Sequence, residues 1–417
     1  KTLKKNWLNY MKRYKKITNC RICNSKKLKK YLDLGSQPLA NSFLKKKDFK
    51  LEKRYPLELL FCKKCSLSQL SVVVDPKLIF NKYDYLSSSS KALSNHYNIL
   101  VNGLEKKYNL KNNSTVVDIG CNDGVLLCNY SKKINNLIGV EPSNAYKKIK
   151  DKRIKVINKF FNKETANYYL KKFEKAKLIT ITNVLAHVDK ANDLIQNIKL
   201  ILDDNGKLII EVPYILDMLN KGTFDLVYHE HLSYFSINSI KHLLERNNLK
   251  IINLKKINFG ASGPSLRIHA THKNNRLKES KIIEKLISLE NKKKIKDYQT
   301  YLRFKEKVKK NINKLRKKLL VLHNAGNKLA CYTAPAKGNT LLNALNLGEE
   351  IFSFVTENNP RKLNKFTPGT HLKIVNDKEI IDSKIKFALL LSWNYKSFFL
   401  KNSNFIKYGG KFLYPFD

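Results

Sequence analysis

The stretch STVVDIGCNDGVLLCNYSKK, residues 114–133, decides the fold of this chain. It begins with an apolar run, continues through a short loop with two glycines, Gly120 and Gly124, and ends in a second apolar run. We expect a buried strand, a tight loop and a helix, because glycines let a backbone turn sharply and approach a ligand closely. Asn122 lies between the glycines, and asparagine tolerates the left-handed backbone region better than most residues.

Strands and helices alternate around this loop, over residues 86–273. The runs typical of further strands are, in order, NLIGV, IKVINKFF, AKLITITNVLAHV, KLIIEVPY, LKIINLKKINF and SLRIHATH. A run with helical spacing, ANDLIQNIKLIL, precedes KLIIEVPY. This alternation predicts an open, doubly wound α/β sheet.

The glycine loop and the strand after it predict a nucleotide-type cofactor. Glu141 follows that strand, where a carboxylate can accept hydrogen bonds from both ribose hydroxyls of an adenosine ligand. The spacing G-x-x-x-G departs from the dinucleotide fingerprint G-x-G-x-x-G, and the loop carries Asp123. An acidic loop suits cationic sulfonium and ammonium groups, so we expect S-adenosylmethionine, with NAD or a structural loop as alternatives. The expected cofactor residues are Asp118, Gly120, Asn122, Gly124, Glu141 and Asn183.

Two C-x-x-C pairs, NCRIC and FCKKC, lie in residues 1–85. Together they supply the tetrahedral four-thiolate set that zinc prefers, and four cysteine ligands leave no position for a substrate. We expect a structural zinc site, with unpaired cysteines or a redox pair as alternatives. Its ligands would be Cys20, Cys23, Cys62 and Cys65. Cys121 is expected to fill space in the glycine loop, and Cys128 and Cys331 to lie in the core.

The C-terminal third begins with a highly charged stretch. Residues 274–322 have apolar side chains at helical intervals and no Pro or Gly, which predicts one or two long amphipathic helices. They could pack between domains or form a coiled coil, so the chain could be a monomer or a homodimer. After Gly326 the alternation resumes and predicts a second, smaller α/β unit. We expect three domains, at residues 1–85, 86–273 and 274–417.

The formal net charge is +47, from 81 Lys and Arg against 34 Asp and Glu. Such an excess suggests polyanionic partners. Lysines are spread over every segment and no block is rich in arginine, which favours compositional drift over nucleic-acid binding. No apolar run approaches the roughly 20 residues that span a bilayer, and no apolar signal core follows the basic N-terminal stretch. We expect a cytoplasmic protein without a membrane partner.

Proton-transfer side chains gather in DLVYHEHLSYFS, residues 225–236. Two tyrosines, two histidines and a glutamate fall within seven consecutive positions of this segment. The metalloprotease pattern H-E-x-x-H is absent because Ser233 occupies the place of its second histidine. Acid–base chemistry is therefore favoured over metal binding here.

The chain resembles the sugar C-methyltransferases of unusual deoxysugar pathways over nearly its whole length. The resemblance rests on CRIC, LDLGSQPLANSF, FCKKC, YDYLSSSS, VVDIGCNDG, IGVEPS, NVLAHVDK, YHEHLSYFS, APAKGNTLLN, FTPGTH and LSWNY, in that order. It implies an α/β fold of three parts: a small zinc-binding N-terminal domain, a Rossmann-like class I methyltransferase domain, and a smaller Rossmann-like C-terminal domain. The implied reaction is methyl transfer to a carbon next to the ketone of a nucleotide-linked hexose.

The resemblance also implies roles for Tyr228, Glu230 and His231. A proton must leave the carbon beside the ketone before that carbon can attack the methyl group. His231 is expected to be the base or to stabilise the enolate, since an ordinary histidine pKa lies near working pH. Tyr228 is the rival base or a donor to the oxyanion, and Glu230 would orient the histidine or bind a sugar group.

Further site residues follow from the same resemblance. His187 is expected near the transferring methyl, and a tyrosine of the N-terminal domain, Tyr83 or Tyr85, is expected to reach the site. His229 is expected to be structural. Tyr234 and Phe235 are expected in the core.

The motif APAKGNTLLNAL places Lys337, Asn339 and Thr340 just before an expected helix. Backbone amides at a helix start, together with a lysine, can bind an anion. We expect these residues to bind the diphosphate of a sugar nucleotide, or else to form a structural β–α turn. Two other functions stay open: an O- or N-methyltransferase on the same scaffold, and an RNA-binding methyltransferase that uses the basic surface.

Overall fold

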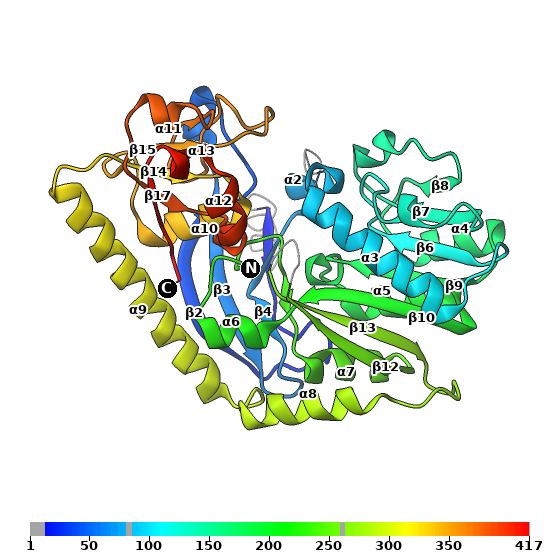
Figure 1. Ribbon diagram of the computed structural model, residues 1–417. Helices are drawn as coiled ribbons and strands as arrows, with labels where there is room; N and C mark the ends of the chain where they lie inside the picture. Colours follow the sequence, from blue (N-terminus) through cyan, green and yellow to red (C-terminus); the bar gives the residue numbers. More distant parts are fainter. Residues whose placement is uncertain (1–12, 81–85, 259–262, 417) are drawn as a thin grey trace.

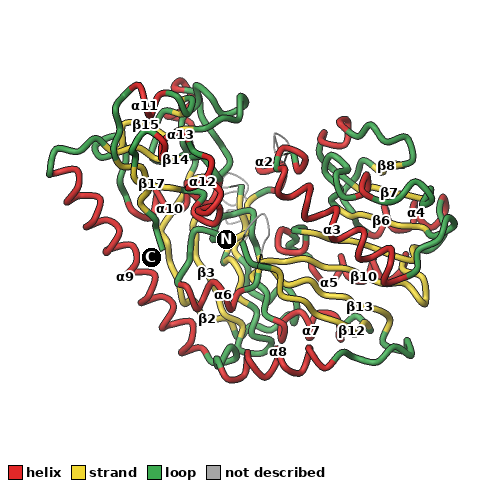
Figure 2. Tube along the Cα trace, viewed as in Figure 1, coloured by secondary structure: helices red, strands yellow, loops and turns green. Residues whose placement is uncertain are grey.

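The protein was studied as a computed structural model, which describes residues 13–80, 86–258 and 263–416 (Figure 1). These residues form a seven-stranded, a four-stranded and a five-stranded sheet, with a separate pair of strands. Figure 2 shows a long helix running along one flank, from the seven-stranded sheet toward the C-terminal sheet.

The seven-stranded sheet forms the middle of the chain. Its strands are β6 (Thr115–Ile119), β7 (Asn136–Val140), β8 (Ile154–Ile157), β9 (Ala176–Thr182), β10 (Leu202–Pro213), β12 (Leu249–Ile257) and β13 (Ser265–His272). They lie in the order β12-β13-β10-β9-β6-β7-β8, and only the pairs that include β13 are antiparallel. The chain leaves β6 to one side and returns to the other at β9, and ligands bind at the carboxyl ends of strands beside such a reversal.

Both faces of this sheet are covered by helices, as the sequence predicts. Val116 of β6 belongs to an apolar cluster with residues of α3 (Lys91–Tyr108). The next residue of the strand, Val117, belongs to the cluster that includes residues of α4 (Lys163–Lys172) and α5 (Ala191–Ile201). Successive strand residues point to opposite faces, so the two clusters confirm the doubly wound arrangement.

The helix expected directly after the glycine loop is absent, and that part of the prediction is wrong. In its place is a single 3-10 turn, η3 (Leu127–Asn129). The guanidinium of Arg153 donates to the carbonyls of Tyr130, Ser131 and Ile134. Those carbonyls would serve further helical turns, so their capture by a side chain allows the helix to end here.

Cys128 also differs from expectation, because its side chain is exposed rather than in the core. Leu127 and Tyr130 are both buried, and residues three apart lie on the same side of a 3-10 turn. Cys128 therefore faces solvent. Cys121 and Cys331 are buried, as expected.

The four-stranded sheet joins two distant parts of the sequence. It contains β2 (Leu28–Pro38), β3 (Arg54–Cys62), β4 (Ser68–Leu70) and β11 (Ser233–Tyr234), in the order β11-β4-β3-β2. The last of these, β11, belongs to the segment 225–236 and pairs antiparallel with β4. Next to this sheet, β1 (Tyr14–Lys16) pairs with β5 (Val72–Val74). The N-terminal module therefore gives the segment 225–236 part of its backbone hydrogen bonding.

The C-terminal sheet is the predicted smaller α/β unit. Its strands are β14 (Leu329–Tyr332), β15 (Phe352–Thr356), β16 (Ile374–Val375), β17 (Phe387–Leu390) and β18 (Lys411–Leu413), all parallel, in the order β16-β15-β14-β17-β18. Helix α10 (Ala336–Leu345) follows β14. The remaining helices of the described residues are short: α2 (Pro76–Phe80), α6 (Ile215–Lys221), α7 (Ile237–Arg246), α11 (Glu379–Asp382), α12 (Lys396–Asn402) and α13 (Asn404–Lys407).

Two helices, α8 (Lys281–Lys292) and α9 (Tyr298–Asn324), occupy the charged stretch. Tyr301 of α9 packs on Phe61 of β3, with ring centroids 4.4 Å apart, and is fully buried. The long helix therefore packs against the N-terminal module. Among the described ranges, no helix combines the length and the apolar character needed to cross a membrane.

Candidate active site

The four cysteines of the two C-x-x-C pairs meet at one point, as predicted. The Sγ atoms of Cys20 and Cys65 are 3.5 Å apart, and those of Cys23 and Cys62 are 3.4 Å apart. All four sulfurs lie within 4.8 Å of one another. Zinc–sulfur bonds of ~2.3 Å in a tetrahedron place the sulfurs ~3.8 Å apart, which these distances fit. A zinc ion here would be fully coordinated by protein, and its role is structural.

The glycine loop leaves no room for side chains at its two glycines. Gly120 has φ +77°, and a Cβ atom there would lie 2.4 Å from Cγ2 of Val184. Gly124 has φ +76°, and a Cβ atom there would lie 2.9 Å from Ile149. Asn122, between them, has φ +51°. The loop therefore has the tight left-handed turns that the sequence predicts.

Glu141 closes this loop from the neighbouring strand. Its Oε2 accepts from the backbone N–H of Asn122 at 2.9 Å, and its Oε1 accepts from that of Ser143 at 2.8 Å. Each carboxylate oxygen keeps further lone-pair capacity, with which it can accept a ribose hydroxyl. The carboxylate is thus held in one orientation at the place where an adenosine ligand needs it.

Acidic and amide oxygens around the loop fit a cationic ligand. Asp123 is buried, and its Oδ2 accepts from the backbone N–H of Ser88, while its Oδ1 has no partner among the described residues. The Oδ1 of Asn183, at the end of β9, is likewise buried without a partner in the described part of the chain. Asp118 points inward and accepts from Thr180 at 2.6 Å, and burial raises its pKa to about 7. The loop therefore suits the sulfonium and ammonium groups of S-adenosylmethionine.

Tyr228 and His231 form a hydrogen-bonded pair. The Nδ1 atom of His231 is 2.9 Å from the carbonyl of Leu226, which can only accept, so Nδ1 carries the proton. In the neutral ring Nε2 is then an acceptor, and the Tyr228 hydroxyl donates to it at 2.9 Å. Burial, with His187 close by, lowers the pKa of His231 to about 3. The ordinary pKa on which its expected role as base was based is therefore not retained.

Glu230 has the opposite displacement. It is buried, and its Oε1 accepts from the side-chain amide of Asn41 at 2.7 Å. Burial raises the pKa of Glu230 to about 7, against the hydrogen bond from Asn41, which lowers it. Asn41, rather than His231, is thus the side chain that contacts the carboxylate.

His187 links this segment to the cofactor loop. It ends the 3-10 turn η5 (Leu185–His187), directly after Val184, which packs on Gly120. Its ring lies edge-on to that of His231, with centroids 4.9 Å apart. Burial lowers the pKa of His187 to about 4, so it is neutral near pH 7. The structure therefore brings together the expected cofactor loop and the segment 225–236.

The other expected residues divide into those described and those not. Tyr83 and Tyr85 lie outside the described residues. His229 is buried, and its Nε2 is 3.3 Å from the carbonyls of Tyr55 and Pro56 in β3, which fits a structural role. Tyr234 and Phe235 are buried in the core, as expected.

Comparison with known proteins identifies the three parts of the chain. Residues 20–80 match a zinc binding domain, residues 97–254 a methyltransferase domain, and residues 260–416 a C-methyltransferase C-terminal domain. The C-methyltransferase NovU of Streptomyces niveus is 26% identical over 405 residues, covering 96% of this chain and 95% of that protein. The chain belongs to these three-domain C-methyltransferases. It is an S-adenosylmethionine-dependent enzyme with a zinc-binding domain.

Solved structures that resemble this methyltransferase share only its middle part. Magnesium protoporphyrin IX methyltransferase from Synechocystis, with bound SAH, is 15% identical, covers 47% of this chain and 91% of its own, and has a TM-score of 0.34. An S-adenosylmethionine-dependent methyltransferase from Clostridium acetobutylicum is 14% identical, with coverages of 47% and 95% and a TM-score of 0.34. The assignment of the fold rests on the strand order and the domain matches.

The three residues expected to bind a diphosphate lie inside α10 of the methyltransferase, not before it, because the helix begins at Ala336. Each contacts another part of the protein. Lys337 lies 3.8 Å from Asp225, Asn339 donates to the carbonyl of Ala40, and Thr340 donates to the carbonyl of Val227. Their role in substrate binding stays a prediction.

The sequence analysis missed three residues of this region. Asn41 binds Glu230 across a long separation in sequence. Asp225 is fully buried, accepts from the indole N–H of Trp393 at 2.6 Å, and faces Lys337. The only signal was their presence in the quoted motifs LDLGSQPLANSF and LSWNY and in the segment 225–236, to which no role had been given.

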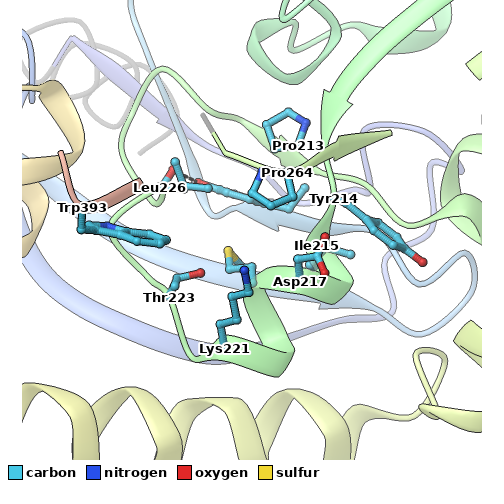
Figure 3. Close-up of a pocket in the computed structure, with 11 residues that line it drawn as sticks. Pro213, Tyr214, Ile215, Asp217, Lys221, Thr223, Leu226, Pro264 and Trp393 are labelled. Atoms are coloured by element: carbon cyan, nitrogen blue, oxygen red, sulfur yellow. Dashed lines mark hydrogen bonds between the residues drawn. The ribbon is translucent and has the colours of Figure 1, made fainter. Parts of the chain in front are cut away.

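A small cavity of about 30 Å³ lies behind the catalytic segment of the methyltransferase. Figure 3 shows Trp393 on one side of it and α6 on the other, with Leu226 between them. The carbonyl of Leu226 is also the acceptor for His231 Nδ1. The cavity is about the size of one water molecule, and it lies on the side of the segment that joins the C-terminal domain.

Proposed function

We propose that this enzyme transfers the methyl group of S-adenosylmethionine to a carbon beside the ketone of a nucleotide-linked keto-sugar. The observation that carries the proposal is the hydrogen-bonded pair Tyr228–His231, with buried Glu230 between them in sequence and His187 linking them to the cofactor loop. A heteroatom acceptor needs no such set, because it already has a lone pair. A carbon acceptor must first lose a proton to a nearby base.

The pair Tyr228–His231 is proposed as the base. His231 is neutral near pH 7 because of its low pKa, so its Nε2 lone pair is available. The Tyr228 oxygen takes the proton from carbon as its own proton passes to Nε2, and the C–H electrons form the enolate. This is the logic of an oxygen atom activated by an adjacent histidine. The Leu226 carbonyl holds the imidazole in the required tautomer throughout.

Glu230 is proposed as the acid. Its pKa of about 7 keeps much of this carboxyl protonated near neutrality, and a protonated carboxyl donates a hydrogen bond to the ketone oxygen as charge develops there. Two groups whose environments push their pKa values apart are the usual basis for assigning a base and an acid. The same reasoning assigns His231 to the basic side and Glu230 to the acidic side.

The bound cofactor would supply an electrophilic methyl group, which the enolate carbon attacks. Glu141 would hold the ribose, and Asp123 and Asn183 offer oxygens to its cationic end. The neutral imidazoles of His187 and His231 lie between the cofactor loop and the catalytic segment. They place no positive charge beside the sulfonium, so they do not oppose its binding.

The test is incubation with methyl-labelled S-adenosylmethionine and a panel of 4-keto nucleotide sugars in deuterated water. The proposal expects deuterium at the carbon beside the ketone when the cofactor is replaced by its demethylated product, and a new carbon–methyl bond when the cofactor is present. A methyl group found on oxygen or nitrogen would overturn the assignment of the acceptor. Cytoplasmic location and oligomeric state remain predictions.

A further inference from the structure

A loop of the N-terminal module lies against the C-terminal domain. We call residues 39–52, between β2 and β3, the strap. Leu44 of the strap and Phe366 exchange backbone hydrogen bonds of 3.0 and 2.8 Å. At the end of the strap, Glu52 accepts from the backbone N–H of Gly369 at 2.8 Å. The strap therefore has fixed contacts with the C-terminal domain along its length.

The start of the strap joins the C-terminal domain to the catalytic segment. The side-chain amide of Asn339 in α10 donates to the carbonyl of Ala40 at 2.7 Å, and both residues are buried. The next residue, Asn41, donates to the carboxylate of Glu230 at 2.7 Å. Two consecutive strap residues thus connect α10 to the carboxyl group proposed as the acid.

We propose that Asn339 is a positioning residue, which fixes the strap at Ala40 so that Asn41 can donate to Glu230. The proposal rests on the role given to Glu230 in the proposed function. A hydrogen bond to a carboxylate stabilises its ionised form, so the position of Asn41 controls how readily Glu230 holds its proton. The C-terminal domain would thereby act on the chemistry without touching the substrate at this point.

Few other groups near Glu230 change charge in the same range of pH. The histidines of this region, His187, His229 and His231, have pKa values lowered by burial to about 4, about 4 and about 3. At the far end of the segment, burial lowers the pKa of Lys337 to about 8, opposed by Asp225. Titration near pH 7 therefore reports on Glu230, and a step near pH 8 reports on Lys337.

The experiment measures the ionisation of Glu230 directly, by infrared difference spectra of the purified full-length protein between about pH 5 and about pH 9. The band of the protonated Glu230 carboxyl is assigned by its loss in Glu230→Gln. Asn41→Leu removes the amide at nearly constant volume and is expected to raise the midpoint by roughly one unit. Asn339→Leu and the milder Asn339→Ala are expected to move the midpoint measurably, although neither contacts Glu230.

The deciding result is the double variant. If Asn339 acts through Asn41, Asn339→Leu has no further effect on the midpoint once Asn41→Leu is present. An Asn339 substitution that leaves the midpoint unchanged, or that shifts it equally in both backgrounds, would overturn the proposal. Tyr332→Phe is the matched control, because it removes a buried hydroxyl hydrogen bond to Asp377 elsewhere in the same domain. Its midpoint should equal that of the wild type.

Two further readouts separate this proposal from its neighbours. Melting temperature and affinity for S-adenosylmethionine show that each variant is folded, and Asn339→Ala serves if the leucine variant is not. A raised KM for the sugar nucleotide with an unchanged Glu230 midpoint would mean that Asn339 binds substrate instead. Loss of the Glu230 band in Glu230→Gln without any effect on turnover would contradict the proposed function, yet leave the strap mechanism intact.

Discussion

Two neighbouring residues, Glu230 and His231, have been moved in opposite directions by the same burial. Removal from water disfavours the charged form of each group, so the pKa of the carboxyl rises to about 7 and the pKa of the imidazole falls to about 3. At neutral pH the segment therefore holds a partly protonated carboxyl next to a wholly neutral imidazole. Its carboxyl is a better proton donor, and its imidazole a better-prepared acceptor, than either would be in the opposite state.

This pair of pKa values predicts the pH dependence of methyl transfer. Because the acid is needed in its protonated form and its pKa is raised, kcat/KM should be highest below pH 7 and fall as pH rises through about 7. Glu230→Gln keeps a hydrogen-bond donor that does not ionise, so its profile should lose this fall. Glu230→Ala should lower kcat by roughly 10²–10⁴-fold. A fall near pH 7 that persists in the glutamine variant would assign it to another group.

Gly120 offers a second prediction at this scale. Gly120→Ala should reduce both stability and affinity for S-adenosylmethionine, because a Cβ atom would meet Val184 in a backbone conformation with φ +77°. Gly35→Ala is the control, since Gly35 has φ +74° but open space around it. Backbone strain of ~1–2 kcal/mol applies to both, and overpacking adds ~1–3 kcal/mol only at Gly120. Urea denaturation and calorimetric cofactor titration measure the difference; equal losses would refute the steric account.

Single residues were predictable where their neighbours in sequence define the chemistry. The cysteine pairs, the glycine loop and Glu141 carry their meaning within a few positions. Asn41 and Asp225 do not, because their partners, Glu230 and Lys337, lie far away in sequence. The pKa of His231 was also beyond the sequence, because burial and not residue type determines it.

At the scale of elements, the pairing of β11 with β4 connects the metal site to the catalytic segment. Cys62 and Cys65 flank the turn that leads from β3 into β4, and β4 pairs with Ser233 and Tyr234. Loss of the metal removes the bonds that fix this turn, because a small module has few other sources of rigidity. The effect should then pass through β4 to the segment that contains His231.

Zinc removal tests this connection. A strong chelator, or Cys62→Ser, should abolish methyl transfer and increase amide hydrogen exchange at Ser233 and Tyr234, while S-adenosylmethionine still binds to the seven-stranded sheet. Metal content is measured by mass spectrometry of the native protein, and Cys128→Ser is the control because Cys128 is exposed and far from the cluster. Unchanged exchange at β11 after complete metal loss would show that the module holds its shape without zinc.

Elements with a strong pattern were predicted well, and elements that depend on distant partners were not. The strands of the seven-stranded sheet are apolar runs bounded by turns, and each was found. The helix after the glycine loop was not, because Arg153 captures the carbonyls that would have continued it. A two-residue strand such as β11 has no pattern of its own and exists only because β4 lies beside it.

At the scale of the whole molecule, a buried ion pair joins the catalytic segment to the C-terminal domain. Lys337 of α10 lies 3.8 Å from Asp225 and covers the ring of Trp393 at 4.5 Å from its centroid. Breaking one partner of a buried pair leaves an uncompensated charge, which costs more than the pair itself contributes.

Lys337→Met should therefore destabilise the protein by ~3–5 kcal/mol. The double variant Asp225→Asn with Lys337→Met should regain most of this loss, because the amide still accepts from Trp393 and carries no charge. Urea denaturation followed by tryptophan fluorescence measures both, and Trp393 is one of only two tryptophans in the chain. A double variant as unstable as the single one would mean that packing, not charge, dominates.

The sheets of the three parts could be predicted from sequence, but the contacts between the parts could not. Those contacts are single hydrogen bonds and ion pairs between loops, such as Asn339 with Ala40, and they leave no periodic trace. The net charge of +47 gave a misleading emphasis to polyanions, because lysine content says nothing about which buried polar pairs hold the domains together.

The strand β11 also constrains how such enzymes can diversify. Because β11 completes a sheet whose other three strands come from the N-terminal module, that module and the segment 225–236 must be inherited as a matched set. Recombination that exchanged the module alone would bring in a foreign edge strand and a foreign residue at position 41. Chimeras between relatives should keep activity only when both pieces cross over together.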